Sequence, residues 1–201
     1  MPPEAKFSAA EIIAAGMEIA KEQGIEAVTA RELGKRLGSS SSPIFTVFKN
    51  MEEVHSELIK TIRTVYDSYI ETALKSEHNA FKAVGTQYIR FASEQPKLFE
   101  ILFMSTHEEI PSIREVLSGI DDNYGLILRS VQEPHKLDEP SAKKIYRHMW
   151  VYTHGIAALI ATKMCSFSGE EISVMLTEMF VGLLKNIKTE ENSHRRDDSN
   201  D

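Results

Sequence analysis

Apolar residues recur along the chain every three or four positions, which is the spacing that gathers them on one face of an α-helix. Glycine and proline separate the segments with this spacing, and no segment alternates apolar and polar residues as a half-buried strand does. Several segments open on Ser, Thr or Asn followed three residues later by Glu, a reciprocal cap of helix starts. The pattern predicts an all-α fold of nine helices, over about residues 8–23, 29–37, 40–49, 50–75, 80–93, 96–104, 112–131, 141–164 and 168–187.

The first three predicted helices are short and tightly linked. Ser8 and Thr29 open the first two, and Ser40 is placed to cap the third. Pro43 is compatible with a helix there because it falls in the first turn, where N–H groups have no intrahelical partner. This is the layout of a helix-turn-helix, whose second member lies in the major groove of DNA.

The pattern also predicts how the chain is divided. A helix-turn-helix DNA-binding domain is expected over 1–52, and a larger helical domain over 53–188. From residue 189 to 201 the chain is polar and has no apolar residue to anchor it, so we expect a disordered tail.

Neither end nor middle of the chain has the features of a targeted or membrane protein. The first residues lack the basic region and the continuous apolar stretch typical of a signal peptide, and the longest uncharged apolar stretch, residues 149–162, is shorter than the ~20 residues of a spanning helix. A single cysteine, Cys165, excludes a disulfide framework and a cysteine-based zinc site. We expect a soluble cytoplasmic protein with no cofactor.

Charge refines this prediction. The net charge of −7 argues at first against a nucleic-acid partner. Residues 1–50, however, carry six basic and six acidic side chains, so the whole excess lies in residues 51–201. Within 29–49 the balance is +3, from Arg31, Lys35, Arg36 and Lys49 against Glu32. Because salt screens charge beyond ~8–10 Å, such a module can bind phosphate despite an acidic body.

Three runs of the sequence resemble a known family. The run GIEAVTARELGKRLGSSSSPIFTVFKNMEEV is similar to the N-terminal domain of the TetR family of bacterial transcriptional regulators, over about residues 8–55. The run HMWVYTHGIAALIATKM resembles the Trp-x-x-x-His-Gly signature of one TetR ligand-domain subgroup, here Trp150, His154 and Gly155. Upstream, YIRFASEQPKLFEILFM is similar to another segment of that subgroup.

The resemblance implies which residues meet DNA. Lys49 and the free N–H groups that open the fourth helix would hold a phosphate. The third helix lacks Arg, Lys, Asn and Gln, the side chains that read bases by paired hydrogen bonds, so the operator sequence does not follow from it. The expected DNA-contacting residues are Thr29, Arg31, Ser40, Ser41, Ser42, Phe45, Thr46 and Lys49.

An alternative remains open at this point. Residues 39–42 taken alone are also compatible with a flexible polar linker. Phe45 and Met51 stand where the family usually has a tyrosine and a lysine. The chain can therefore also be interpreted as a helical ligand-binding or interaction protein with a degenerate DNA-binding module.

The resemblance also implies a dimer, in which the last two helices of two subunits pair. The side chains expected in the interface are Ile145, Met149, Ile156, Ile160, Met175, Met179, Phe180, Leu183 and Leu184. A helix that is apolar on more than one face is either enclosed or has a second partner, and these two helices have that pattern.

Aromatic and methionine side chains provide a candidate ligand cavity, lined by Tyr88, Phe99, Phe103, Met104, Tyr124, Trp150 and His154. The same side chains are equally compatible with an ordinary core. For His154, a buried histidine bonded to a neighbour is favoured over a metal or ligand contact.

The function that follows is a ligand-responsive transcriptional regulator, a repressor, which binds operator DNA as a homodimer. A small, mostly apolar or aromatic effector would release it. The chain lacks the Gly-rich phosphate loop, the nucleophile elbow and the paired-His zinc helix of common enzyme classes, so we predict no catalysis and no metal.

Overall fold

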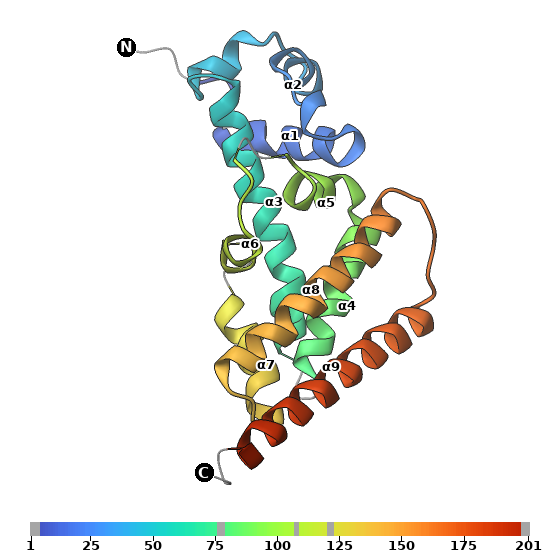
Figure 1. Cartoon of the computed structure of the whole chain (residues 1–201). Coiled ribbons are helices and arrows are strands. Elements are labelled where there is room, and N and C mark those ends of the chain that lie inside the picture. The colour runs from blue at the N-terminus through green and yellow to red at the C-terminus, as the bar shows by residue number, and fades with distance from the viewer. Residues whose placement is uncertain (1–4, 76–78, 107–108, 120–122, 198–201) are drawn as a thin grey trace. The chain divides into compact units, whose positions relative to one another are not determined.

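The computed structural model describes residues 5–75, 79–106, 109–119 and 123–197. Within these ranges it contains nine α-helices, two short 3₁₀ helices and no strand (Figure 1). The all-α prediction is confirmed. The elements are α1 (Ala9–Gln23), η1 (Ile25–Ala27), α2 (Ala30–Arg36), η2 (Ser42–Thr46), α3 (Met51–Leu74), α4 (Ala80–Glu94), α5 (Pro96–Phe103), α6 (Ile113–Gly119), α7 (Tyr124–His135), α8 (Glu139–Ala161) and α9 (Gly169–Asp197).

The chain forms two compact units. The first contains Met1–Ser68 and Phe91–Thr106, and the second contains Tyr69–Arg90 and His107–Asp201. Both α3 and α4 therefore contribute residues to each unit. These limits differ from the expected division after residue 52, which stays a prediction.

The first unit is built around α1. Ser8 caps this helix in a reciprocal box with Glu11, as the sequence predicts. The helix buries Ile12 and Ile19 completely. It packs on α2 and α5, and α5 contributes the fully buried Phe99. The apolar stripe on α1 thus forms the centre of the helix-turn-helix unit.

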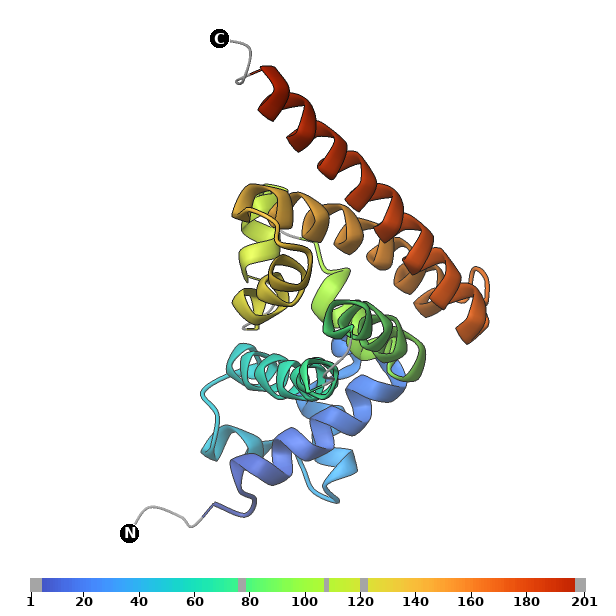
Figure 2. The same ribbon diagram turned by 90° about the horizontal axis from the view of Figure 1, so that it is seen from below.

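The second unit is built around α8, which packs against α7 on one side and α9 on the other (Figure 2). Asp138 caps α8 by accepting the Ser141 N–H at 2.8 Å. Within this unit, Gly85 of α4 lies close to α8 and α9, since a Cβ there would lie 3.6 Å from Thr153 Oγ1 and 3.7 Å from Leu176 Cδ1. A glycine in α4 therefore lets three helices meet.

Three sequence predictions are wrong in detail. The third helix is a five-residue 3₁₀ helix, η2, and Ser40 does not cap it. The helix expected over 112–131 is two helices, α6 and α7, with residues 120–122 outside the described ranges. The backbone expected to be disordered from residue 189 continues as α9 to Asp197, while residues 198–201 lie outside the described ranges.

No helix within the described ranges is long and apolar enough to cross a membrane.

Candidate nucleic-acid interface

The turn after α2 is held tightly against that helix. Thr29 caps α2 by accepting the Glu32 N–H at 3.2 Å, and the Ser39 N–H donates to the Gly34 carbonyl at 2.8 Å. A Cβ on Gly34 would lie 2.9 Å from the Ser40 carbonyl carbon, a separation that real Cβ atoms hardly ever show, and 3.0 and 3.1 Å from the carbonyl oxygens of Ser39 and Ser40. The glycine is therefore what allows the turn to pass over α2.

The 3₁₀ helix η2 has one buried and one exposed side. Ile44 is fully buried and Phe48, just beyond the helix, is 5% exposed, so these two side chains anchor the segment. Ser40, Ser42 and Thr46 are exposed, Ser41 is half-buried, and the ring of Phe45 is 46% exposed. The structure thus brings five of the predicted DNA-contacting residues together on one short element and the turn before it.

The start of α3 is capped, as the sequence predicts, by Asn50. Its Oδ1 accepts the Glu53 N–H at 2.9 Å, while the Glu53 carboxylate accepts the Lys49 N–H at 2.6 Å. Two of the N–H groups expected to hold a phosphate are thus already paired within the chain. The Lys49 side chain is exposed, so its ammonium group remains a candidate phosphate contact.

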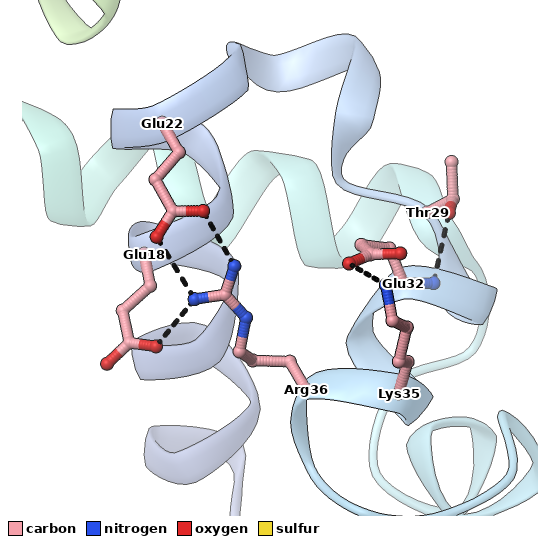
Figure 3. A network of polar contacts seen from close by, with 6 residues as sticks. All are labelled: Glu18, Glu22, Thr29, Glu32, Lys35 and Arg36. Atoms are coloured by element: carbon pink, nitrogen blue, oxygen red, sulfur yellow. Dashed lines mark hydrogen bonds and ion pairs between the residues drawn. The ribbon is translucent and has the colours of Figure 1, made fainter.

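The predicted basic patch is less basic in the fold than in the sequence. Arg36 reaches across to α1, where its guanidinium bonds Glu22 at 2.8 Å and Glu18 at 3.1 Å (Figure 3). The hydrogen bonds that Arg36 donates to these carboxylates raise the pKa of Arg36, and the same pairing lowers the pKa of Glu22. Arg36 therefore joins α2 to α1.

Among the remaining cations, Lys35 lies 3.4 Å from Glu32 on the same helix. Arg31 and Lys49 are exposed. Arg31 sits in the first turn of α2, directly after the Thr29 cap. These two cations, rather than Arg36, remain as candidate phosphate contacts at α2 and η2.

Two further residues of this unit were not predicted from the sequence. His55 on α3 donates from Nε2 to the Val28 carbonyl at 2.7 Å, which ties α3 to the residue before the α2 cap. Lys6 donates from Nζ to Ser39 Oγ at 3.0 Å. Neither contact can be predicted from residue spacing, because the first joins residues 27 positions apart and the second joins residues 33 positions apart.

The predicted ligand residues are divided between the two compact units. Phe99 and Phe103 belong to the first unit, where they contact each other and the ring of Phe91, with centroids 5.2 to 6.5 Å apart. Met104 follows in the same unit and is 40% exposed. The other four residues belong to the second unit, where Tyr124 packs edge-on against Tyr146.

The second unit does bring three of the predicted residues together. The Tyr88 hydroxyl lies 2.9 Å from His154 Nδ1, and the His154 ring stacks on Trp150 with centroids 5.0 Å apart. Burial lowers the pKa of His154, so its imidazole is neutral at pH 7. The buried Trp150 Nε1 has no hydrogen-bond partner among the described residues. This arrangement is a histidine bonded to a neighbour, the interpretation favoured from the sequence.

An open hollow of about 490 Å³ lies at the start of α9, lined by Phe167, Ser168, Glu170, Glu171, Val174 and Met175. It contains none of the predicted ligand residues.

The predicted dimer surface needs one correction. Ile145, Met149 and Ile156 are buried within the chain's own core, at 0%, 7% and 3% exposed, so they offer no surface to a second copy. The other six predicted side chains are half-buried: Ile160, Met175, Met179, Phe180, Leu183 and Leu184.

Exposed apolar side chains lie elsewhere on the same two helices. Val151 on α8 is 53% exposed, and Val174 and Val181 on α9 are 48% and 40% exposed. Gly155 and Gly182 are also exposed, and within the described chain no atom beyond their own helix backbone lies within 4 Å of where their Cβ atoms would be. Val151 and Val181 were not predicted, because the helical period alone does not tell which apolar face packs inward.

Comparison with known protein families agrees with this geometry. Residues 12–58 match the model of bacterial regulatory proteins of the tetR family, and residues 81–181 match that of the tetracyclin repressor-like C-terminal domain. The chain belongs to the TetR family. It is a transcriptional regulator with an N-terminal DNA-binding domain and a family C-terminal domain, and not an enzyme.

Sequences related to this TetR-family regulator include one that matches along nearly its whole length. The chain is 23% identical over 195 residues to the uncharacterized HTH-type transcriptional regulator YobS of Bacillus subtilis, covering 94% of this chain and 98% of that protein. It is 31% identical over 84 residues to the nucleoid occlusion factor SlmA of Haemophilus ducreyi, covering 40% of this chain and 42% of that protein.

Solved structures of regulators share its fold. The fatty acid degradation regulator FadR from Bacillus halodurans matches with a TM-score of 0.59 and 14% identity, over 88% of this chain and 94% of that one. A transcriptional regulator from Rhodococcus sp. Rha1 matches with a TM-score of 0.54 and 19% identity, over 90% and 97% of the two chains. At these identities the likeness concerns the fold alone.

Proposed function

We propose that this TetR-family regulator is a homodimeric repressor that acts in the bacterial cytoplasm. It binds operator DNA through α2, η2 and the start of α3, and it releases the DNA when its C-terminal domain takes up a small, mostly apolar effector. One observation supports DNA binding most directly: a set of exposed side chains lies on η2 and the turn before it, namely Ser40, Ser42, Phe45 and Thr46. The buried side chains of Ile44 and Phe48 anchor this segment to the core. A surface held this rigidly can fit a groove without first being ordered.

Binding to the DNA upstream of the protein's own gene, titrated with salt, tests this part. We expect tighter binding to that duplex than to a scrambled one, and an affinity that falls as salt rises because phosphate contacts release counterions. Equal binding to both duplexes at low salt would reject the proposal. It would favour the alternative, a helical ligand-binding or interaction protein with a degenerate DNA-binding module.

The homodimer is supported by the apolar side chains of α8 and α9 that are 40% to 53% exposed, namely Val151, Val174 and Val181. Exposed glycines on the same helices as these valines would let α8 and α9 of a second copy pack closely against α8 and α9 of the first. Two-fold symmetry would present two DNA-reading units to half-sites ~34–36 Å apart. Light scattering at micromolar concentration is expected to give twice the chain mass of 22.7 kDa, and a mass near 22.7 kDa would contradict the dimer.

Effector binding is supported by the cluster of Tyr88, Trp150 and His154 in the C-terminal domain. Trp150 is the single tryptophan of the chain, so its emission reports this cluster alone. We expect some members of a broad panel of hydrophobic compounds to change this emission and to lower the affinity for DNA. Emission unchanged across the panel would reject control by an apolar effector at this cluster.

A further inference from the structure

Lys6 lies beside the turn that precedes η2. The capping box of Ser8 and Glu11 fixes the chain two residues further on, with Ser8 N–H and Ser8 Oγ both 2.8 Å from the Glu11 carboxylate. From there the Lys6 side chain reaches Ser39 Oγ, to which its Nζ donates at 3.0 Å. Ser39 is itself held by the Gly34 carbonyl. This hydrogen bond places the Lys6 ammonium group beside the turn that precedes η2.

The charge of Lys6 is not neutralised by this arrangement. Its contacts are a neutral hydroxyl and the ring of Phe7, whose centroid is 5.3 Å from Nζ. In the described part of the chain, no carboxylate lies within ion-pair distance of it. Arg36, by contrast, is paired with two carboxylates and Lys35 with one. A lysine ammonium has three N–H donors, so Ser39 leaves two of them for another acceptor.

The neighbours of Ser39 are the residues proposed to face DNA. Ser40 and Ser42 follow it closely and are exposed, as is Lys6. An unneutralised cation next to such a surface meets the phosphate backbone, which supplies most contacts of a protein–DNA interface. The sequence offers no sign of this, because Lys6 lies 33 residues before Ser39 and outside the helix-turn-helix.

We infer that Lys6 binds a backbone phosphate of the DNA, so that the segment before α1 forms part of the DNA interface. This inference rests on the proposed function. The positive charge of Arg36 is offset by Glu18 and Glu22, whereas no carboxylate in the described part of the chain offsets that of Lys6. Because phosphates carry no base information, this contact adds affinity for any duplex and no sequence preference.

The test is a salt titration of DNA binding for three full-length variants. With Lys6→Gln, we expect the slope of log K against log salt to become shallower by about 0.9 for each subunit bound, equally for the upstream and scrambled duplexes. Lys6→Arg keeps the charge and is expected to keep the slope. Lys21→Gln removes the same charge from the exposed last turn of α1 and is the matched control, expected to leave the slope unchanged.

Two outcomes would overturn the inference while leaving the proposed function intact: a Lys6→Gln slope equal to that of the wild type, or an equal change in Lys21→Gln. Wild-type protein that binds neither duplex at low salt would overturn both proposals together. Thermal unfolding of each variant shows whether the fold is kept, and the Lys6→Arg slope separates loss of charge from loss of structure.

Discussion

Gly34 is the residue on which the geometry of the DNA-binding unit most directly depends. Alanine is a better helix former than glycine by about 1 kcal/mol, but here its Cβ would meet backbone atoms of Ser39 and Ser40. Forcing such an overlap typically costs about 1–3 kcal/mol. We expect Gly34→Ala to lower the free energy of unfolding in urea. Gly125→Ala in α7, whose Cβ would make only an ordinary contact, is the control expected to be neutral or stabilising.

Arg36 and Arg31 lie on the same short helix but are expected to respond differently to substitution. Arg36→Gln removes the ion pairs with Glu18 and Glu22, so we expect a lower melting temperature and an unchanged salt dependence of DNA binding. Arg31→Gln removes an exposed cation, so we expect an unchanged melting temperature and a salt slope that is shallower by about 0.9 for each phosphate that Arg31 neutralises. The reverse pattern would contradict this division of roles.

His154 gives the protein a pH dependence whose sign follows from burial. The pKa of His154 is lowered from 6.5 in the folded chain, so the unfolded chain binds more protons over the range between the two values. The free energy of unfolding should therefore fall as pH decreases through and below about 6.5. Burial lowers the pKa of His135 as well, and the nearby charge of Lys188 lowers it further. His135 therefore also makes the free energy of unfolding fall as pH decreases.

The stacked Trp150 ring makes this titration visible. A protonated imidazole quenches indole emission, so we expect the emission of folded protein to drop on acidification with a midpoint below pH 6.5. In His154→Gln this step should disappear. A midpoint at or above 6.5, or a step that persists in His154→Gln, would contradict the assignment.

Among the elements, helix starts were predicted best because their signal is local. The caps at Ser8, Thr29 and Asn50 each depend on a side chain bonding an N–H three residues away, and each is present in the structure. The element at η2 was predicted worse. Backbone hydrogen bonds in η2 join residues three positions apart, and the Thr46 hydroxyl donates to the Pro43 carbonyl. The spacing of apolar residues does not distinguish such a 3₁₀ helix from an α-helix.

The end of α9 was not predicted, for a different reason. A polar segment does not nucleate a helix alone, but extending an existing helix adds one bond for each residue fixed. The segment after residue 189 follows an established helix, and Lys144 on α8 bonds Glu190 at 2.7 Å. In the same way, the pairing of Arg36 with Glu18 and Glu22 on α1 depends on tertiary packing, which residue spacing does not report.

At the scale of helix pairs, the exposed valines of α8 and α9 give a direct test of the proposed dimer. Val151→Glu combined with Val181→Glu would place two charges of each subunit in an apolar interface, where unpaired charges are costly. We expect monomers by light scattering and weaker DNA binding. Leu126→Glu on α7, an apolar residue 48% exposed, is the matched control expected to stay dimeric. A dimeric valine variant would place the interface elsewhere.

For the whole molecule, the question is how a C-terminal site changes DNA binding. Both α3 and α4 carry residues of the two compact units, so each unit includes part of a helix that continues into the other. We propose that an effector favours one of two arrangements of these helices and thereby alters the fit to two half-sites. Coupling of this kind is reciprocal, because the effector and the DNA bias the same equilibrium.

Reciprocity makes the final prediction quantitative. An effector that weakens DNA binding by some factor, within the roughly 5–150-fold range usual for such coupling, must itself bind more weakly by that factor when DNA is bound. Titrating the active compound against Trp150 emission, with and without saturating upstream duplex, measures one factor; titrating DNA with and without the compound measures the other. We expect the two to agree. The compound could instead lower the affinity for DNA while DNA leaves its own affinity for the protein unchanged. That result would mean that the compound acts by binding the DNA or by unfolding the protein, and not by binding the C-terminal domain.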